Sequence, residues 1–230
     1  MTTKLDKKQI KCAIFDLDGT LLNTIETINY YLNLALETNG FPSICKEDTL
    51  SFVGDGARKL ISRTITRLGI DETAFDKLFY DYNRLYDADP YYLTEPYEGI
   101  SELLSELKNQ GIKLAVLSNK PDFAAKAAIT YFFPESFDLV VGAKEETPLK
   151  PDPRSLLPLL SSLDVTENEI VYVGDSEPDV ALSNNADLRF PIMVSWGFRT
   201  RERLLSCGAK NVIDKPGEII DIIKKTELSS

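Results

Sequence analysis

The sequence of 230 residues contains no histidine. This absence excludes histidine-based triads, histidine metal sites and histidine general bases, so acid–base chemistry near neutral pH falls to carboxylates or a lysine. Cysteine is also scarce. The three residues, Cys12, Cys45 and Cys207, have no paired spacing, which fits a reducing compartment.

Long apolar runs are missing as well. No stretch approaches the ~20 apolar residues that a membrane helix needs. Residues 1–11 are polar and lysine-rich, unlike a secretory signal. We therefore expect a cytoplasmic protein with no membrane partner.

Acidic residues outnumber basic ones, so the formal net charge is -10, and the sequence contains no basic cluster. This balance disfavours nucleic acid as a partner. A small phosphorylated substrate remains compatible with it, because a bound cation can reverse the local field. The length suits one large domain, or a core with one insertion.

The most informative stretch runs from Ile14 to Leu22. A short apolar run ends at two aspartates separated by one leucine, followed by Gly19, as expected for a buried strand that leaves a sheet. Strand side chains alternate between faces, so Asp16 and Asp18 can face one pocket while Leu17 points into the protein. The alternative for this pattern is an acidic turn after a strand, since Asp-Gly is common in turns.

Three consecutive segments then carry apolar residues at helical spacing, with no convincing strand among them. They cover residues 23–39, 57–69 and 75–90. We predict from them an all-helical domain over residues 23–89, inserted after the first strand.

From Tyr97 onward, apolar strands alternate with helices. The strands are predicted at 114–117, 139–141, 170–173, 191–194 and 211–213. Fully apolar strands separated by helices imply a parallel sheet covered on both faces. The predicted fold class is therefore α/β, with a Rossmann-like core over residues 1–22 and 90–230.

Polar side chains follow several of these strands, where sites form in open parallel sheets. Ser118 and Asn119 follow the second strand, and Asp175 and Asp179 follow the fourth. Lys150 precedes Pro151, which disfavours helix at the lysine. Each residue has a plainer explanation: Ser118 as a loop hydroxyl, Lys150 as a surface lysine, and Asp179 as the partner of Ser176 in a capping box.

The ordered set resembles the four signatures of the haloacid dehalogenase superfamily of phosphohydrolases. The first signature is DLDGTLL, and the stretches GIKLAVLSNKP, FDLVVGAKEETPLKPDP and VYVGDSEPDV contain the others. With TEPYEGI and WGFRTRERLL, they resemble the phosphoglycolate phosphatase branch. The resemblance covers nearly all of residues 11–20 and 94–220, and the insertion fits that branch's helical cap.

The resemblance implies a role for each residue. Asp16 attacks phosphorus, and Asp18 protonates the leaving group and then activates water. Ser118 and Lys150 hold the non-bridging phosphoryl oxygens, and Asn119 is a further substrate-binding residue. Asp16 and Asp175 bind a metal ion by their side chains, Asp18 by its backbone carbonyl, and Asp179 directly or through water.

Physical chemistry independently favours a metal at this position. At ~4 Å and an effective dielectric near 20, each pair of carboxylates repels by about 4 kcal/mol. A hard divalent cation with oxygen ligands relieves the repulsion, and beside a phosphate Mg2+ is expected.

Within the insertion, the segment FVGDGAR is the candidate specificity element. Gly54 and Gly56 at a helix start leave backbone N–H groups open to an anion, and Arg58 is placed to pair with a carboxylate. The alternative is a plain turn with a surface arginine.

These observations predict a Mg2+-dependent phosphatase for a small phosphorylated metabolite, with phosphoglycolate as the leading substrate and a monomer or homodimer as the assembly. A β-phosphoglucomutase or a pyrophosphatase is the nearest enzymatic alternative. A receiver-like regulatory module is the non-enzymatic one, but it needs neither the insertion nor Asp18. Asp18 also argues against a dehalogenase, since resembling dehalogenases lack that second acidic residue.

Overall fold

Six parallel strands form the central sheet of the computed structural model, which describes residues 10–145 and 147–228. Their order is β5-β4-β1-β6-β7-β8, so β1 lies between β4 and β6. The strands are β1 (Cys12–Phe15), β4 (Lys113–Pro121), β5 (Leu139–Ala143), β6 (Ile170–Gly174), β7 (Pro191–Val194) and β8 (Val212–Ile213). Every strand predicted from the sequence is present.

The sheet is buried on both faces because its side chains alternate between two apolar layers. In β1, Ala13 and Phe15 join one buried cluster, while Cys12 and Ile14 join the other. In β6, Val171 and Val173 again oppose Tyr172. This two-sided burial is the reason for the unbroken apolar runs in the sequence.

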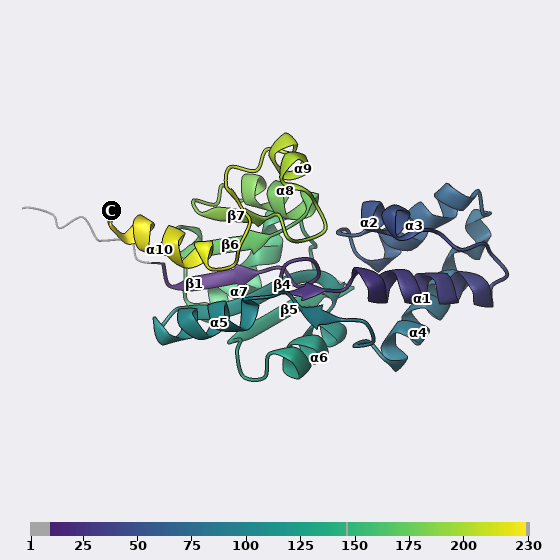
Figure 1. Cartoon of the computed structure of the whole chain (residues 1–230), viewed down its shortest axis with the longest axis horizontal. Helices are drawn as coiled ribbons and strands as arrows, with labels where there is room; N and C mark the ends of the chain where they lie inside the picture. The colour runs from purple at the N-terminus through teal and green to yellow at the C-terminus, as the bar shows by residue number, and fades with distance from the viewer. Residues whose placement is uncertain (1–9, 146, 229–230) are drawn as a thin grey trace, which may run out of the picture.

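Helices from separate parts of the chain cover each face (Figure 1). The first cluster includes residues of α5 (Ile100–Asn109), α6 (Asp122–Phe132) and α10 (Glu218–Leu228). The second includes residues of α7 (Leu157–Leu163), α8 (Glu177–Asn185) and α9 (Arg201–Ser206). The layered α/β architecture with helices on both faces is thus confirmed.

A separate group of helices lies beyond one end of the sheet (Figure 1). It contains α1 (Ile25–Thr38), α2 (Lys46–Phe52), α3 (Ala57–Leu68) and α4 (Phe75–Ala88). These helices have their own buried cluster, which we call the cap cluster, and Phe198 from the core belongs to it. Helix α2 was not predicted, because Thr49 is its only buried residue and no apolar stripe marks it.

A two-stranded antiparallel ribbon joins the helical group, here called the cap, to the core. It pairs β2 (Leu22–Asn23) with β3 (Glu95–Pro96). Strands of two residues carry no periodic signal, so the sequence does not predict them. The domain limits at residues 23 and 89 stay a prediction, and this ribbon is the structural feature nearest to them.

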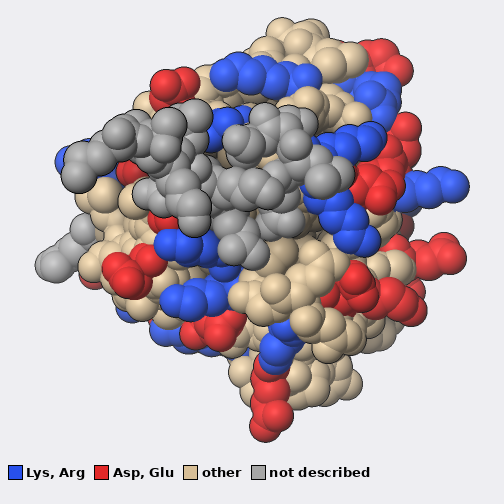
Figure 2. Space-filling model, turned by 90° about the vertical axis from the view of Figure 1, so that its left-hand side faces the viewer, with Lys and Arg blue, Asp and Glu red and all other residues tan. Residues whose placement is uncertain are grey.

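The surface carries both signs of charge. Figure 2 shows the end of the molecule away from the cap, where lysine and arginine side chains alternate with aspartate and glutamate. In residues 10–145 and 147–228, no helix is long and apolar enough to cross a membrane.

Candidate active site

Side chains from the ends of three strands, and from the segments that follow them, converge where β1 lies beside β4 and β6. Asp16 directly follows β1, Asp175 directly follows β6, and Ser118 lies near the end of β4. The parallel pairing of these strands brings their carboxyl ends to one edge, so residues far apart in sequence become neighbours.

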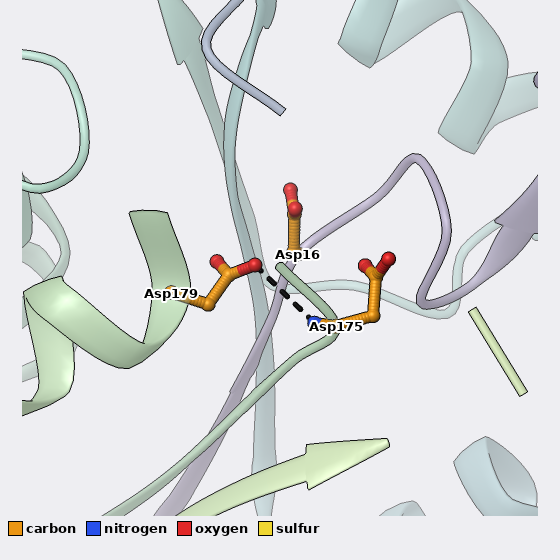
Figure 3. A group of neighbouring side chains, drawn as sticks. All are labelled: Asp16, Asp175 and Asp179. Atoms are coloured by element: carbon orange, nitrogen blue, oxygen red, sulfur yellow. Dashed lines mark hydrogen bonds between the residues drawn. The ribbon is translucent and has the colours of Figure 1, made fainter. Parts of the chain in front are cut away.

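Three aspartates meet at this edge. One carboxylate oxygen from each of Asp16, Asp175 and Asp179 lies within 4.8 Å of the others. Figure 3 shows Asp16 between the other two carboxylates, with a hydrogen bond joining the Asp175 backbone nitrogen to Asp179. All three side chains are buried, so water screens their repulsion poorly.

Asp16 is held by one amide and one ammonium group. Its Oδ1 accepts a hydrogen bond of 2.7 Å from the Leu17 N–H, and its Oδ2 lies 2.8 Å from Lys150 Nζ. Burial raises the pKa of Asp16 to about 7, while the Lys150 charge opposes the rise. The carboxylate therefore depends on neighbouring cations to remain ionised.

Lys150 lies between two aspartates, because its Nζ is also 2.8 Å from Asp179 Oδ1. Burial works against its charge, but Asp16 and Asp179 together raise the pKa of the ammonium group. The peptide bond that joins Lys150 to Pro151 is cis. Lys150 is thus a buried, charged residue of the site, and the alternative of a surface lysine is wrong.

Asp179 is saturated by donors from the protein. Its Oδ1 accepts from Lys150 Nζ and from the Tyr172 hydroxyl at 2.6 Å. Its Oδ2 accepts from the Asp175 and Ser176 amides and from the Ser176 hydroxyl. The capping box between Ser176 and Asp179 is present, so the plainer explanation for Asp179 is also correct. Burial is outweighed by Lys150, and the pKa of Asp179 is lowered.

No cation among the described residues pairs with Asp175. It accepts hydrogen bonds from the Thr20 hydroxyl at 2.7 Å and the Phe198 N–H at 2.8 Å. Burial, followed by repulsion from Asp179 and Asp16, raises its pKa well above the usual range. Two glycines make room for it: a Cβ at Gly19 would lie 2.2 Å from Asp175 Oδ2, and one at Gly197 would lie 2.5 Å from Asp175 Cβ.

These residues fit a divalent cation. Asp16 and Asp175 are buried oxygen donors whose pKa values are raised, and Lys150 neutralises only Asp16 and Asp179. A hard cation with oxygen ligands would supply the missing positive charge beside Asp175. The donor groups on both Asp179 oxygens leave that carboxylate poorly suited to direct coordination.

A cavity of about 80 Å3 opens above Asp16 and Asp18, between the core and the cap. Most of its wall is apolar or aromatic. The cap contributes Ile28, Val53, Gly54, Gly56, Ala57, Leu60, Tyr82, Asn83, Tyr86 and Asp87, and the core contributes Asp16, Asp18, Ser118, Asn119, Lys120, Pro121, Ala124 and Phe198.

Lys120 is a residue of the candidate site whose role the sequence does not indicate. Its Nζ lies 3.2 Å from Asp18 Oδ1 and donates a hydrogen bond of 2.8 Å to the Tyr86 hydroxyl of the cap. Burial works against its charge, but Asp18 and Tyr86 raise the pKa of the ammonium group. Its position directly after Ser118 and Asn119, beyond a site-bearing strand, was the available signal.

The predicted substrate-binding residues differ in their placement. Ser118, Gly54 and Gly56 line the cavity. Asn119 also lines it, but its side chain bonds the backbone N–H and C=O of Lys150 and the carbonyl of Gly54. Asn119 therefore fixes the Lys150 backbone and the cap loop, which leaves its amide little capacity for a ligand.

The structure does not bring Arg58 to the cavity. Its guanidinium carbon lies 5.0 Å from the ring centroids of both Phe75 and Phe79, within the cap. The side chain lies against α4 instead, and Arg58 is not among the described residues that line the cavity. The expected pairing of Arg58 with a substrate carboxylate thus has no support in the geometry.

Three comparisons agree with this architecture. A model of the haloacid dehalogenase-like hydrolases matches residues 13–193. A phosphoglycolate phosphatase of Cereibacter sphaeroides is 33% identical over 190 residues, covering 81% of this chain and 86% of the relative. A pyrophosphatase of Bacillus cereus is 30% identical over 216 residues, covering 94% and 97%.

A solved structure extends the likeness to three dimensions. A protein from Lactobacillus delbrueckii superposes with a TM-score of 0.86 at 30% identity, covering 94% of this chain and 98% of its own. The shared fold covers 94% of this chain and therefore includes the cap.

Proposed function

The chain belongs to the haloacid dehalogenase-like hydrolases and is a phosphatase of that family, and from this premise we propose its reaction. It hydrolyses a small phosphomonoester, with phosphoglycolate as the leading substrate, in the presence of Mg2+. The reaction proceeds through a phosphoaspartate at Asp16.

The observation that carries this proposal is the setting of Asp16. Its carboxylate lies at the floor of a cavity, is held by Leu17 N–H and Lys150, and shares the cavity with Asp18 two residues along. A nucleophile needs a fixed position and an accessible face. A second carboxyl within the same cavity supplies the proton transfers that the chemistry requires.

In the first step, an Asp16 oxygen attacks phosphorus, and the bond from phosphorus to the leaving oxygen breaks. Asp18 gives its proton to that oxygen, so the alcohol departs neutral. In the second step, Asp18 takes a proton from water as the water attacks phosphorus. Inorganic phosphate forms, and the Asp16 carboxylate is restored.

The residues around this centre hold the phosphoryl group. The Ser118 hydroxyl lines the cavity, and Lys150 places a positive charge 2.8 Å from the Asp16 carboxylate. Mg2+, bound by Asp16 and Asp175 with Asp18 contributing its backbone carbonyl, would neutralise charge on the phosphoryl oxygens. Asp179 holds Lys150 in place and would add negative charge near this ion.

The leaving group occupies the cap side of the cavity. Gly54 and Gly56 bring the cap loop against the core there, and no side chain caps the first turn of α3. The cavity volume of about 80 Å3 is well below that of the usual ligand pocket, which favours a leaving group of few atoms. Phosphoglycolate fits this limit, and the similar C. sphaeroides protein is named a phosphoglycolate phosphatase.

Pyrophosphate is the second candidate, because the B. cereus pyrophosphatase matches nearly the full length of the chain. It is also small. The two differ in the group beside the leaving oxygen, a carboxylate in one and a phosphate in the other.

The test is phosphate release from a panel of phosphorylated metabolites, including phosphoglycolate, pyrophosphate, glucose 1-phosphate and para-nitrophenyl phosphate. Asp16→Asn should abolish release from every member, because the amide is a poor nucleophile. Asp221→Asn, at an exposed position in α10, should release phosphate at the wild-type rate. Turnover by a folded Asp16→Asn protein, checked by circular dichroism, would refute the mechanism.

A further inference from the structure

Lys120 lines the cavity, and its positive charge indicates the chemistry of the leaving group. We propose that Lys120 is the specificity-determining residue, and that it recognises a carboxylate on the carbon next to the ester oxygen. The inference rests on the proposed phosphatase function and names the substrate class as phosphorylated α-hydroxy acids.

Lys120 is the only positively charged residue among the described residues that line the cavity. Lys150 is occupied between Asp16 and Asp179, on the phosphoryl side. Arg58 is stacked on phenylalanine rings within the cap. An anionic group on the leaving side therefore has one cation to meet.

The position of Lys120 matches the size of such a group. Its Nζ is 3.2 Å from Asp18, the residue that gives a proton to the leaving oxygen. Two successive hydrogen-bond lengths place the ammonium group within about 6 Å of that oxygen. A carboxylate on the adjacent carbon falls between them, whereas an anion several carbons further along would extend past Lys120.

The contacts of Lys120 leave it able to accept this partner. Its two distances to the Asp18 oxygens, 3.2 and 3.3 Å, are long for a charge-assisted hydrogen bond. The shorter bond goes to the Tyr86 hydroxyl of the cap. A substrate carboxylate can therefore share Lys120 with Asp18 while the bond to the cap is kept.

The rest of the wall excludes other classes of leaving group. Apolar and aromatic residues of the cap and the core together make up most of it, so a polyhydroxylated sugar would leave hydroxyl groups without partners. Asp87 borders the cavity near Lys120 at an exposed position on α4, and its negative charge opposes larger polyanions. A small acid with one carboxylate satisfies both limits.

The experiment compares two substrates of equal size. Phosphoglycolate carries the carboxylate, and its amide derivative carries a neutral group at the same place. The wild-type protein should have a higher kcat/KM for phosphoglycolate. In Lys120→Met the ratio of the two kcat/KM values should fall by about tenfold to a hundredfold, the range expected for one charged hydrogen bond.

Two further variants separate charge from shape. Lys120→Arg retains a cation and should keep part of the preference. Lys126→Met removes an exposed lysine of α6 and should leave the ratio at its wild-type value. Equal losses on both substrates in Lys120→Met would overturn the proposal, because they would mean that Lys120 only orients Asp18.

The wild-type protein alone also provides a test, should the Lys120 variants fail to fold. Hydrolysis of the amide or of para-nitrophenyl phosphate without any preference for phosphoglycolate would overturn the role of Lys120 and leave the phosphatase function standing. Failure to hydrolyse any phosphomonoester would remove both.

Discussion

Asp179 does not line the cavity, yet its contacts connect residues of the proposed catalytic centre. Five donors surround its carboxylate, and one of them is the Lys150 ammonium group that also holds Asp16. Tyr172, fully buried in β6, fixes the side of the carboxylate that faces Lys150. Asp16, Lys150 and Asp179 are therefore linked by short polar contacts.

The crowded carboxylates predict a pH-dependent effect of metal on stability. The pKa values of Asp16 and Asp175 are raised in the metal-free fold, to about 7 for Asp16 from 3.8. Such groups bind protons more tightly in the folded state, so they lower the free energy of unfolding as the pH rises from about 4 toward 7. Bound Mg2+ removes this penalty, and its stabilising effect should grow over the same interval.

Thermal unfolding of dialysed protein, with and without Mg2+ at pH 5 and pH 7.5, checks this. At a hundred times its dissociation constant, metal contributes about 2.7 kcal/mol, or roughly 5–10 °C for a chain of this size. Acidic groups with lowered pKa, such as Glu169 beside Lys11, act in the opposite direction, so the readout is the difference made by the metal. An increment that is equal at both pH values would contradict the prediction.

Arg58 gives a prediction of the opposite kind, an effect on stability without one on specificity. Because its guanidinium lies over Phe75 and Phe79, Arg58→Ala should lower the free energy of unfolding by about 0.5–1 kcal/mol. The ratio of kcat/KM between phosphoglycolate and its amide should stay constant. Urea unfolding and the two-substrate assay measure both, and a selective loss on phosphoglycolate would show that Arg58 reaches the cavity.

At the scale of elements, the start of α3 determines how closely the cap approaches the core. Gly56 precedes this helix with φ 83° and ψ 170°, a conformation almost confined to glycine. A Cβ there would also lie 3.1 Å from the Asn119 carbonyl. Gly69 ends the same helix in the left-handed conformation, with no atom within 4 Å of an added Cβ.

The two glycines form a matched pair for mutation. Gly56→Ala should lower the free energy of unfolding by about 1–3 kcal/mol, and Gly69→Ala by about 1 kcal/mol. Only Gly56→Ala should also lower kcat/KM, because it pushes the cap loop away from Asn119. Steady-state kinetics at a temperature where both variants are folded decides the matter, and equal activity in the two would show that the contact is not needed.

The elements found from sequence are those with a continuous physical signal. The strands of the sheet are apolar throughout because helices cover both faces, and α1, α3 and α4 have a wide apolar stripe. The ribbon and α2 have neither an unbroken apolar run nor a wide apolar stripe. At the site, the aspartates were found from their spacing, but the bonds of Asn119 to Lys150, 31 residues away, depend on the folded chain.

On the scale of the whole molecule, one core loop holds the cap over the cavity. Phe198 inserts into the cap cluster, and Arg199 donates to the carbonyls of Leu50 and Val53 at 2.6 and 2.8 Å. The same loop supplies the Phe198 N–H to Asp175. The position of the cap and the Asp175 carboxylate are thereby joined through three consecutive residues, 197–199.

We expect Arg199→Ala to lower kcat/KM by roughly tenfold for all substrates alike, because closure of the cap loses two charge-assisted hydrogen bonds. Arg203→Ala is the control: Arg203 also pairs with Glu177, but it is largely exposed and no described contact joins it to the cap. Kinetics on phosphoglycolate and para-nitrophenyl phosphate, with limited proteolysis of the cap, measure the effect. Wild-type rates in Arg199→Ala would mean that Phe198 alone suffices.

The ribbon of β2 and β3 also bears on how such proteins diversify. Leu22 pairs with Pro96 and Asn23 with Glu95, so the polypeptide leaves the core and returns to it at a single point. Insertions whose ends lie together are tolerated, since the register of β1 with β4 and β6 does not depend on what lies between them. The segment between residues 24 and 94 can therefore be replaced as one unit. Such an exchange would replace the cap wall of the cavity and leave the aspartate cluster of the core in place.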